Sequence, residues 1–91
     1  MKFLMEPHRI YAEGEKNKLL AEVTFPETKN GLWDINHTFV DDSLRGQGIA
    51  GKLMEAVAKQ AEAKNKKLLP TCSYAVQWFE KHKEYQELLW K

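Results

Sequence analysis

The chain contains the stretch Arg45-Gly46-Gln47-Gly48-Ile49-Ala50, a glycine-rich turn that leads directly into an amphipathic helical pattern. Glycines let the backbone come close to a ligand, because they carry no side chain and adopt conformations that other residues avoid. The start of a helix adds unpaired N–H groups and the positive end of the helix dipole. Together these features bind phosphate groups. The stretch therefore predicts a phosphate-binding turn.

The residues after the turn predict one long helix and a crossover to a short strand. Apolar residues recur at helical spacing, at Ile49, Leu53, Val57 and Ala61. Asn65 is a residue type that ends helices. Residues 67–71 form the strand, and the length of the crossover places it parallel to an earlier strand at 32–40. Pro70 has no N–H to donate, so pairing between these two strands should fail near it.

Three alternating segments before the turn predict an antiparallel meander. They are residues 8–13, 19–25 and 32–40, separated by polar turns at 14–18 and 26–31. Alternation in the third segment places four residues on one face, which are Trp33, Ile35, His37 and Phe39. Short connections favour antiparallel neighbours. This half of the chain should therefore form most of a sheet.

The C-terminal part predicts two further helices. Ser73 is a good N-cap for the first, with Ala75, Val76 and Phe79 as expected buried positions, and the second covers roughly residues 84–90. The expected order is β-β-β-α-β-α. We predict one α/β domain over residues 1–91, with a mixed, mostly antiparallel sheet of about four strands and two to three helices.

Composition narrows the class of protein. The chain has 91 residues, with 14 Lys and Arg against 13 Asp and Glu, so its net charge of +1 gives no basis for nucleic-acid or membrane attraction. Cys72 is the single cysteine, which excludes an internal disulfide and suits a reducing compartment. Residues 1–25 lack the pattern of a secretory signal. We expect a cytoplasmic protein without a metal site and favour a monomer, although no pattern decides the oligomeric state.

The glycine stretch also matches two other phosphate-binding patterns. Gly46-x-Gly48-x-x-Gly51 fits a dinucleotide fingerprint, but the preceding strand alternates and the chain is too short for a doubly wound sheet. The spacing from Gly46 to Gly51-Lys52 fits most of a Walker A loop, but Leu53 follows where Mg²⁺ coordination needs Ser or Thr. Both patterns are therefore disfavoured.

A third pattern, [Gln/Arg]-x-x-Gly-x-[Gly/Ala], is met by Arg45, Gly48 and Ala50. Here the chain resembles the GNAT superfamily of acetyl-CoA-dependent acetyltransferases, and residues 39–50 look like its strand–loop–helix segment. A second segment, Cys72 to Phe79, resembles the family's Asn-x-x-Ala-x-x-[Leu/Trp]-[Tyr/Phe] pattern with Cys in place of Asn. The likeness covers roughly residues 19–82 and is nearest to very small, single-domain GNAT-like proteins of reduced fold.

The resemblance implies an N-acetyltransferase that moves acetyl from acetyl-CoA to a primary amine of a small molecule or a protein. The loop amides would bind the coenzyme A pyrophosphate, and the pantetheine arm would pair with open backbone groups beside the third strand. The implied cofactor-binding residues are Phe39, Val40, Arg45, Gly46, Gln47, Gly48, Ile49, Ala50, Ser73 and Tyr74.

Three residues are candidates for the base or the nucleophile. His37 could act as a base near neutral pH, or be a satisfied core histidine between its apolar neighbours. Cys72 could accept the acetyl group transiently, since a helix start favours the thiolate, or be a small buried residue. Asp34 lies where some family members carry an acidic base, or is a solvated strand residue. Tyr74 and Tyr85 are possible proton donors to the leaving thiolate, and packing is the alternative for both.

Three departures from larger family members leave a second function open. The turn at 14–18 has no room for the helices that larger members place there, and the chain lacks their final strand pair. Phe79 stands where a tyrosine often serves as general acid. The alternative is a non-catalytic acyl-CoA-binding module, and a third reading is an interaction domain without a ligand.

Overall fold

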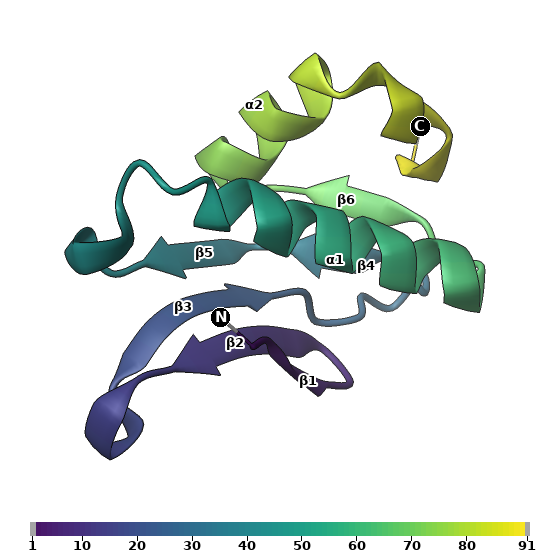
Figure 1. Cartoon of the computed structure of the whole chain (residues 1–91). Helices are drawn as coiled ribbons and strands as arrows, with labels where there is room; N and C mark the ends of the chain where they lie inside the picture. Colours follow the sequence, from purple (N-terminus) through teal and green to yellow (C-terminus); the bar gives the residue numbers. More distant parts are fainter. Residues whose placement is uncertain (1, 91) are drawn as a thin grey trace.

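The computed structural model describes residues 2–90 and has the α/β architecture that the sequence predicts (Figure 1). In chain order the elements are β1 (Leu4–Glu6), β2 (Arg9–Glu13), the 3-10 helix η1 (Glu15–Asn17), β3 (Leu19–Thr24), β4 (Trp33–Ile35), β5 (His37–Val40), η2 (Asp42–Leu44), α1 (Ile49–Lys64), β6 (Leu68–Pro70), α2 (Ser73–Lys81) and η3 (Lys83–Leu88). The sheet is mostly antiparallel, as expected.

Two sets of strands make up the sheet region. β1, β2, β3 and β5 are hydrogen-bonded in that order and antiparallel, while β4 and β6 form a separate parallel pair. β1 was not predicted, because all three of its residues are exposed and show no alternation of burial. The parallel pairing of the strand after the crossover is confirmed, over Leu68–Pro70.

The segment predicted as one strand over 32–40 is divided at Asn36. Thr24 lies opposite His37, whereas Glu27 lies opposite Trp33. Between these two pairs the chain advances by three residues in the first segment (24 to 27) and spans four in the second (33 to 37). The extra residue is a β-bulge, which inverts the alternation beyond it. The prediction that His37 and Phe39 share a face with the buried Ile35 was therefore wrong, and both are exposed.

The core lies between α1 and one face of the antiparallel strands. Many of its fully buried members come from β2, β3 and α1: Ile10, Ala12, Ala21, Val23, Leu53, Met54, Val57, Ala58 and Ala61. We call the opposite face of these strands the outer face; it carries Glu22, His37 and Phe39, since successive side chains on a strand alternate. Among residues 2–90, no helix is long and apolar enough to cross a membrane.

The C-terminal elements pack along β6 and α1. Helix α2 begins one residue earlier than predicted, since the N-cap is Cys72, and its Val76 is exposed rather than buried. The predicted final helix is the 3-10 helix η3, after which Leu89 bridges to Leu68. The Trp90 N–H donates to the Leu68 carbonyl at 2.9 Å. The end of the described chain thus occupies part of the free side of β6.

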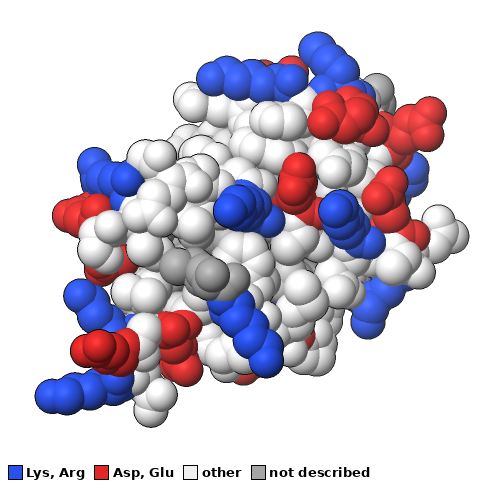
Figure 2. Space-filling view, viewed as in Figure 1, with Lys and Arg blue, Asp and Glu red and all other residues white. Residues whose placement is uncertain are grey.

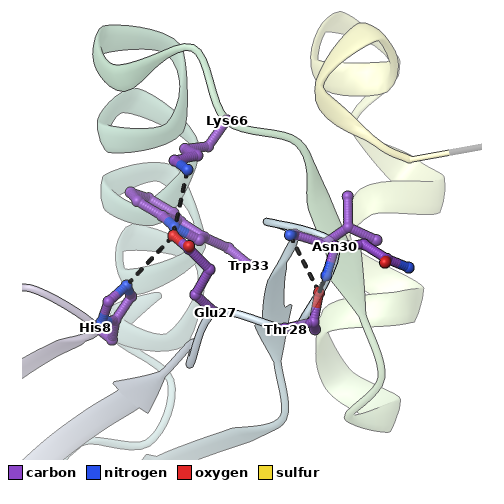
Figure 3. A network of polar contacts seen from close by, with 7 residues as sticks. His8, Glu27, Thr28, Asn30, Trp33 and Lys66 are labelled. Carbon is purple, nitrogen blue, oxygen red and sulfur yellow. Dashed lines mark hydrogen bonds and ion pairs between the residues drawn. The ribbon is translucent and has the colours of Figure 1, made fainter.

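A polar network joins three loops at the end of α1 opposite the glycine stretch (Figure 3). Glu27 Oε1 lies 3.3 Å from Lys66 Nζ, 3.4 Å from Trp33 Nε1 and 4.0 Å from His8 Nε2. The hydrogen bond and charge of Lys66 lower the pKa of Glu27. In the same loop, Thr28 Oγ1 accepts from the Asn30 N–H at 3.3 Å. The contacts of Glu27 therefore hold together the loop between β1 and β2, the loop between β3 and β4, and the loop between α1 and β6.

Candidate active site

The glycine loop, residues 45–50, adopts the backbone conformation that its glycines permit. Gly46 and Gly48 have φ angles of 81° and 70°, in the left-handed region that other residues rarely adopt. A side chain added at either position would meet no other atom within 4 Å, so the space beside the loop is open. The loop therefore exposes its backbone to the surroundings.

The first turn of α1 leaves its amides without capping side chains. Gly48 is the N-cap, and none of the described side chains hydrogen-bonds to this helix end. The first helical bond runs from the Lys52 N–H to the Gly48 carbonyl at 3.1 Å, so the amides of Ile49, Ala50 and Gly51 precede it. The first turn contains no acidic residue. This end of α1 is suited to an anion.

A pocket of about 210 Å³ opens beside this helix start. Its lining residues are Val40, Leu44, Arg45, Gly46, Gly48, Ile49, Ala50, Gly51 and Tyr74. Seven of the predicted cofactor-binding residues line it, whereas Phe39, Gln47 and Ser73 do not. Leu44 was not predicted as a site residue, and Gly51 was assigned only to the disfavoured patterns. A larger pocket of about 470 Å³ is formed by other elements, at Lys67, Gln86, Glu87, Leu89 and Trp90.

Charges near the loop are largely paired or dispersed. Arg45 Nε lies 2.9 Å from Asp42 Oδ1, and both side chains are strongly exposed. Asp41 Oδ2 accepts from the Ser43 N–H and hydroxyl, and these bonds lower the pKa of Asp41. Figure 2 shows acidic and basic side chains interspersed over the face that carries α1. Within residues 2–90, no three His, Cys, Asp or Glu side chains are grouped to hold a metal ion.

The two parallel strands separate just beyond Pro70. β4 and β6 pair as far as Ile35 and Pro70, and the Ile35 carbonyl then accepts from the N–H groups of Thr71 and Cys72, each at 3.0 Å. β5 continues alone as the last strand of its sheet. The expectation that pairing fails near Pro70 is confirmed.

The backbone register shows which groups β5 presents at this open edge. The Asp41 N–H donates to the Leu20 carbonyl at 2.8 Å. Since bonding alternates along an antiparallel pair, Phe39 turns its N–H and C=O toward β3, whereas Thr38 and Val40 turn theirs toward the open edge. We call the side of Thr38–Val40 that faces away from β3 the open edge.

Cys72 faces the open edge from the side of α1. Its Sγ accepts from the Ala75 N–H at 3.3 Å as the N-cap of α2, and lies 3.4 Å from Thr38 Oγ1. The sulfur is half-buried. Among the described residues its polar partners are thus a hydroxyl and an amide, neither of which is a base at neutral pH.

His37 lies on the other face of β5. Its side chain is 52% exposed, and its Nε2 lies 3.3 Å from Glu22 Oε1. The alternative of a buried core histidine was therefore wrong. Because Thr38 contacts Cys72 and successive side chains on a strand point to opposite faces, His37 and Cys72 flank β5 from its two sides. The structure does not bring these two candidates into contact.

The remaining candidates lie around the separated strands. Asp34 Oδ1 accepts from the Thr71 hydroxyl at 2.5 Å, so this carboxylate is engaged rather than simply solvated. Burial raises the pKa of both Tyr74 and Tyr85. Tyr74 lines the loop pocket, Tyr85 packs against Trp78 and Phe79, and Phe79 is buried in the core.

Comparison with known proteins identifies the family. Residues 9–88 match the family described as GCN5-related N-acetyl-transferase. A GCN5-like protein from Staphylococcus aureus, solved by NMR, shares 34% identity with a TM-score of 0.82, over 98% of this chain and 87% of that one. A search of curated proteins gave no match.

Two larger proteins of known structure share the fold. A ribosomal-protein-alanine N-acetyltransferase from Brucella melitensis biovar Abortus 2308 has 26% identity and a TM-score of 0.55, over 91% of this chain and 62% of its own. A predicted acetyltransferase from Clostridium acetobutylicum, solved with acetyl-CoA, has 21% identity and a TM-score of 0.58, over 81% of this chain and 55% of its own. The extent of the family match and the close structural likeness to the small staphylococcal protein place this chain in the GCN5-related N-acetyltransferase family.

Proposed function

We propose that the protein binds acetyl-CoA and transfers its acetyl group to a primary amine. The observation that carries the proposal is the uncapped start of α1, which borders a pocket of about 210 Å³ that is also lined by Val40 of the open edge. Membership of the family and the acetyl-CoA present in the Clostridium structure of the same fold support it.

Two parts of the site suit two parts of the cofactor. The amides of the glycine loop and of Ile49, Ala50 and Gly51 would bind the pyrophosphate, with Arg45 and Tyr74 beside it. The pantetheine arm carries amide groups, and these would pair with the open edge as an added strand does. The thioester would then lie where β5 and β6 separate.

Acetyl transfer needs a base for the amine and a route for the leaving group. The amine nitrogen attacks the thioester carbonyl carbon, the C–N bond forms, the C–S bond breaks, and coenzyme A leaves as a thiolate. We assign the amine proton to His37, while the Cys72 S–H, at the opposite side of β5, donates to the departing thiolate. Because Cys72 and His37 do not touch, direct transfer is favoured over an acetyl-Cys72 intermediate.

A charge placed in the loop tests the cofactor site. Gly48→Glu puts a carboxylate where the pyrophosphate would bind, so we expect it to abolish binding of acetyl-CoA. Gly31→Glu is the matched control, because Gly31 also has a positive φ (77°) and open space around it but lies in the β3–β4 connection. The measurement is thermal unfolding with excess acetyl-CoA, where a ligand at a hundred times its Kd adds about 2.7 kcal/mol.

The two variants give a clear decision. Loss of the acetyl-CoA shift in Gly48→Glu, with the shift retained in Gly31→Glu, supports the assignment. Equal affinity in wild type and Gly48→Glu contradicts it. NAD⁺ serves as a second comparator, and stabilisation by NAD⁺ alone would favour the dinucleotide pattern.

One observation favours a second function, that of a non-catalytic acyl-CoA-binding module. Phe79 is buried where a tyrosine often acts as general acid in the family, so that proton donor is absent at this position. A turnover assay over a panel of amines and peptides separates the two. Thiol release above the rate in buffer, reduced by about a hundredfold in His37→Ala, establishes catalysis and the role of the base. Binding without thiol release establishes the module.

A further inference from the structure

The β-bulge at Asn36 directs His37 to the outer face of the sheet, away from Cys72. Bulges are found beside active sites, where they re-aim side chains. We infer that the amine acceptor reaches the thioester across the outer face, and that Glu22 is a positioning residue that orients His37 as the base. The inference rests on the proposed acetyl transfer.

Glu22 is held between two partners, one for each carboxylate oxygen. Its Oε2 accepts from Arg9 Nε at 2.5 Å, and its Oε1 lies 3.3 Å from His37 Nε2. Its side chain is only 16% exposed, compared with 52% for His37. A carboxylate fixed by an arginine from the next strand has little freedom to rotate. Glu22 therefore holds a fixed direction toward the histidine ring.

Arg9 is in turn fixed from two sides. Its guanidinium lies 3.8 Å from the centre of the Tyr11 ring and 3.5 Å from Glu6 Oε2. The hydrogen bond to Glu22 raises the pKa of Arg9, so the arginine remains charged at every working pH. The groups that face His37 are thus Glu22 on β3, with Arg9 on β2 and Glu6 on β1 behind it.

This geometry specifies which ring nitrogen of His37 takes the proton. A carboxylate accepts hydrogen bonds, so the neutral ring carries its hydrogen on Nε2 and leaves Nδ1 as the acceptor. The amine proton then passes to Nδ1 as the C–N bond forms. The resulting imidazolium is stabilised by the Glu22 carboxylate, in the manner in which a carboxylate orients the base of other acyl-transfer enzymes.

The acceptor would meet a mixed surface on this side. Phe39 lies two residues after His37 on the same face and is 36% exposed, so an apolar ring stands next to the base. At the bulge itself, Thr24 Oγ1 donates to Asn36 Oδ1 at 2.6 Å. An amine carried on an apolar group fits this surface better than a strongly anionic acceptor, given the carboxylates of Glu22 and Glu6.

The first test is spectroscopic and does not depend on turnover. Nitrogen-15 NMR of the histidine rings reports which nitrogen carries the hydrogen in the neutral form. Because a free imidazole also favours the Nε2–H form, the decisive readout is the Nε2-bound proton of His37. We expect this proton to be shifted downfield and protected from exchange in wild type and in Glu6→Gln, and to move upfield and exchange faster in Glu22→Gln, where the carboxylate acceptor is gone. Glu6→Gln is the matched control, because Glu6 contacts Arg9 on the same face without contacting His37. The same Nε2–H signal, with the same exchange rate, in all three proteins overturns the positioning role.

The second test is kinetic and uses the full chain with acetyl-CoA and the best amine of the panel. Glu22→Gln should lower kcat by about tenfold, less than the roughly hundredfold loss expected when the base itself is removed, with the KM for acetyl-CoA unchanged. Glu6→Gln should change neither quantity, and Glu22→Asp should restore part of the loss.

The outcomes separate this inference from the proposed function. If wild type fails to bind acetyl-CoA, the proposed function fails, and the role of His37 as base fails with it. If acetyl-CoA binds and amines are acetylated but Glu22→Gln behaves like Glu6→Gln, only the inference fails. An effect of Glu22→Gln on stability alone, seen in thermal unfolding with a normal kcat, also overturns it.

Discussion

At the scale of single residues, glycines shape the backbone of the proposed binding site. Gly46 and Gly48 adopt the left-handed backbone conformation in the connection that leads from β5 to α1. Gly51 lets α2 approach the first turn of α1. A Cβ at Gly51 would lie 3.2 Å from Trp78 Nε1 and 3.8 Å from Tyr74 Oη. The three glycines therefore serve different purposes, two in conformation and one in packing.

Gly51→Ala provides a test of the packing role. Alanine in place of glycine inside a helix normally stabilises a protein by about 1 kcal/mol. Here Trp78 is stacked on His82 with ring centres 3.7 Å apart and lies edge-on to Phe79, so it cannot easily move away. We expect Gly51→Ala to be neutral or destabilising in urea unfolding. A gain close to the full helix value would show that Trp78 yields, and that the close approach is not constrained.

At the scale of elements, the loop network around Glu27 ties three connections together. The lowered pKa of Glu27 has a defined consequence for stability. Since the folded-state pKa lies below the unfolded one, the contribution is complete above the unfolded pKa. It is lost as the pH falls through the lower folded pKa. The exposure of the pair means that salt also weakens it.

Unfolding measured as a function of pH tests this network. Between neutral pH and the acidic range in which glutamates titrate, wild type should lose stability more steeply than Glu27→Gln. Glu15→Gln is a suitable control, since it removes one carboxylate from the 3-10 helix η1, which connects β2 and β3 at the ends of these strands opposite the network. Parallel curves for wild type and Glu27→Gln would mean that the ion pair with Lys66 contributes nothing measurable.

Element prediction from sequence succeeded where one periodicity dominated and failed where tertiary pairing intervened. The stripe from Ile49 to Ala61 predicted α1, and Asn65, in the left-handed conformation, ends it as expected. The bulge at Asn36 could not be read from residues 32–40, because an alternating pattern looks continuous on either side of one extra residue. For the site, the glycine loop was visible as a motif, whereas the partnership of Glu22 with His37 arises only when β3 and β5 pair.

At the scale of the whole molecule, the strands and the helices pack on one shared hydrophobic core. The described residues form a body of radius of gyration 12.8 Å in which α1 contacts β2, β3, β5, α2 and η3. A domain of this size buries about 60% of its unfolded surface, so its stability margin is small. A defect in the middle of α1 should therefore affect the fold as a unit.

Leu53→Ala tests this dependence. Leu53 is fully buried in the core, so truncation should lower the free energy of unfolding by about 3 kcal/mol in a single cooperative transition. Saturating acetyl-CoA should recover most of that loss, since ligand at a hundred times its Kd adds about 2.7 kcal/mol. Two separate transitions, or full stability in the variant, would contradict the picture of one core.

The open edge of β5 also bears on how the protein behaves in solution. An unpaired strand edge is a template on which a strand from another copy can assemble, and proteins generally protect such edges. Here the edge borders the proposed binding site, so it cannot be closed by a permanent strand without blocking the ligand. Occupancy by the pantetheine arm would therefore protect the protein from self-association, and the ligand-free state is the one at risk of aggregation during storage or concentration.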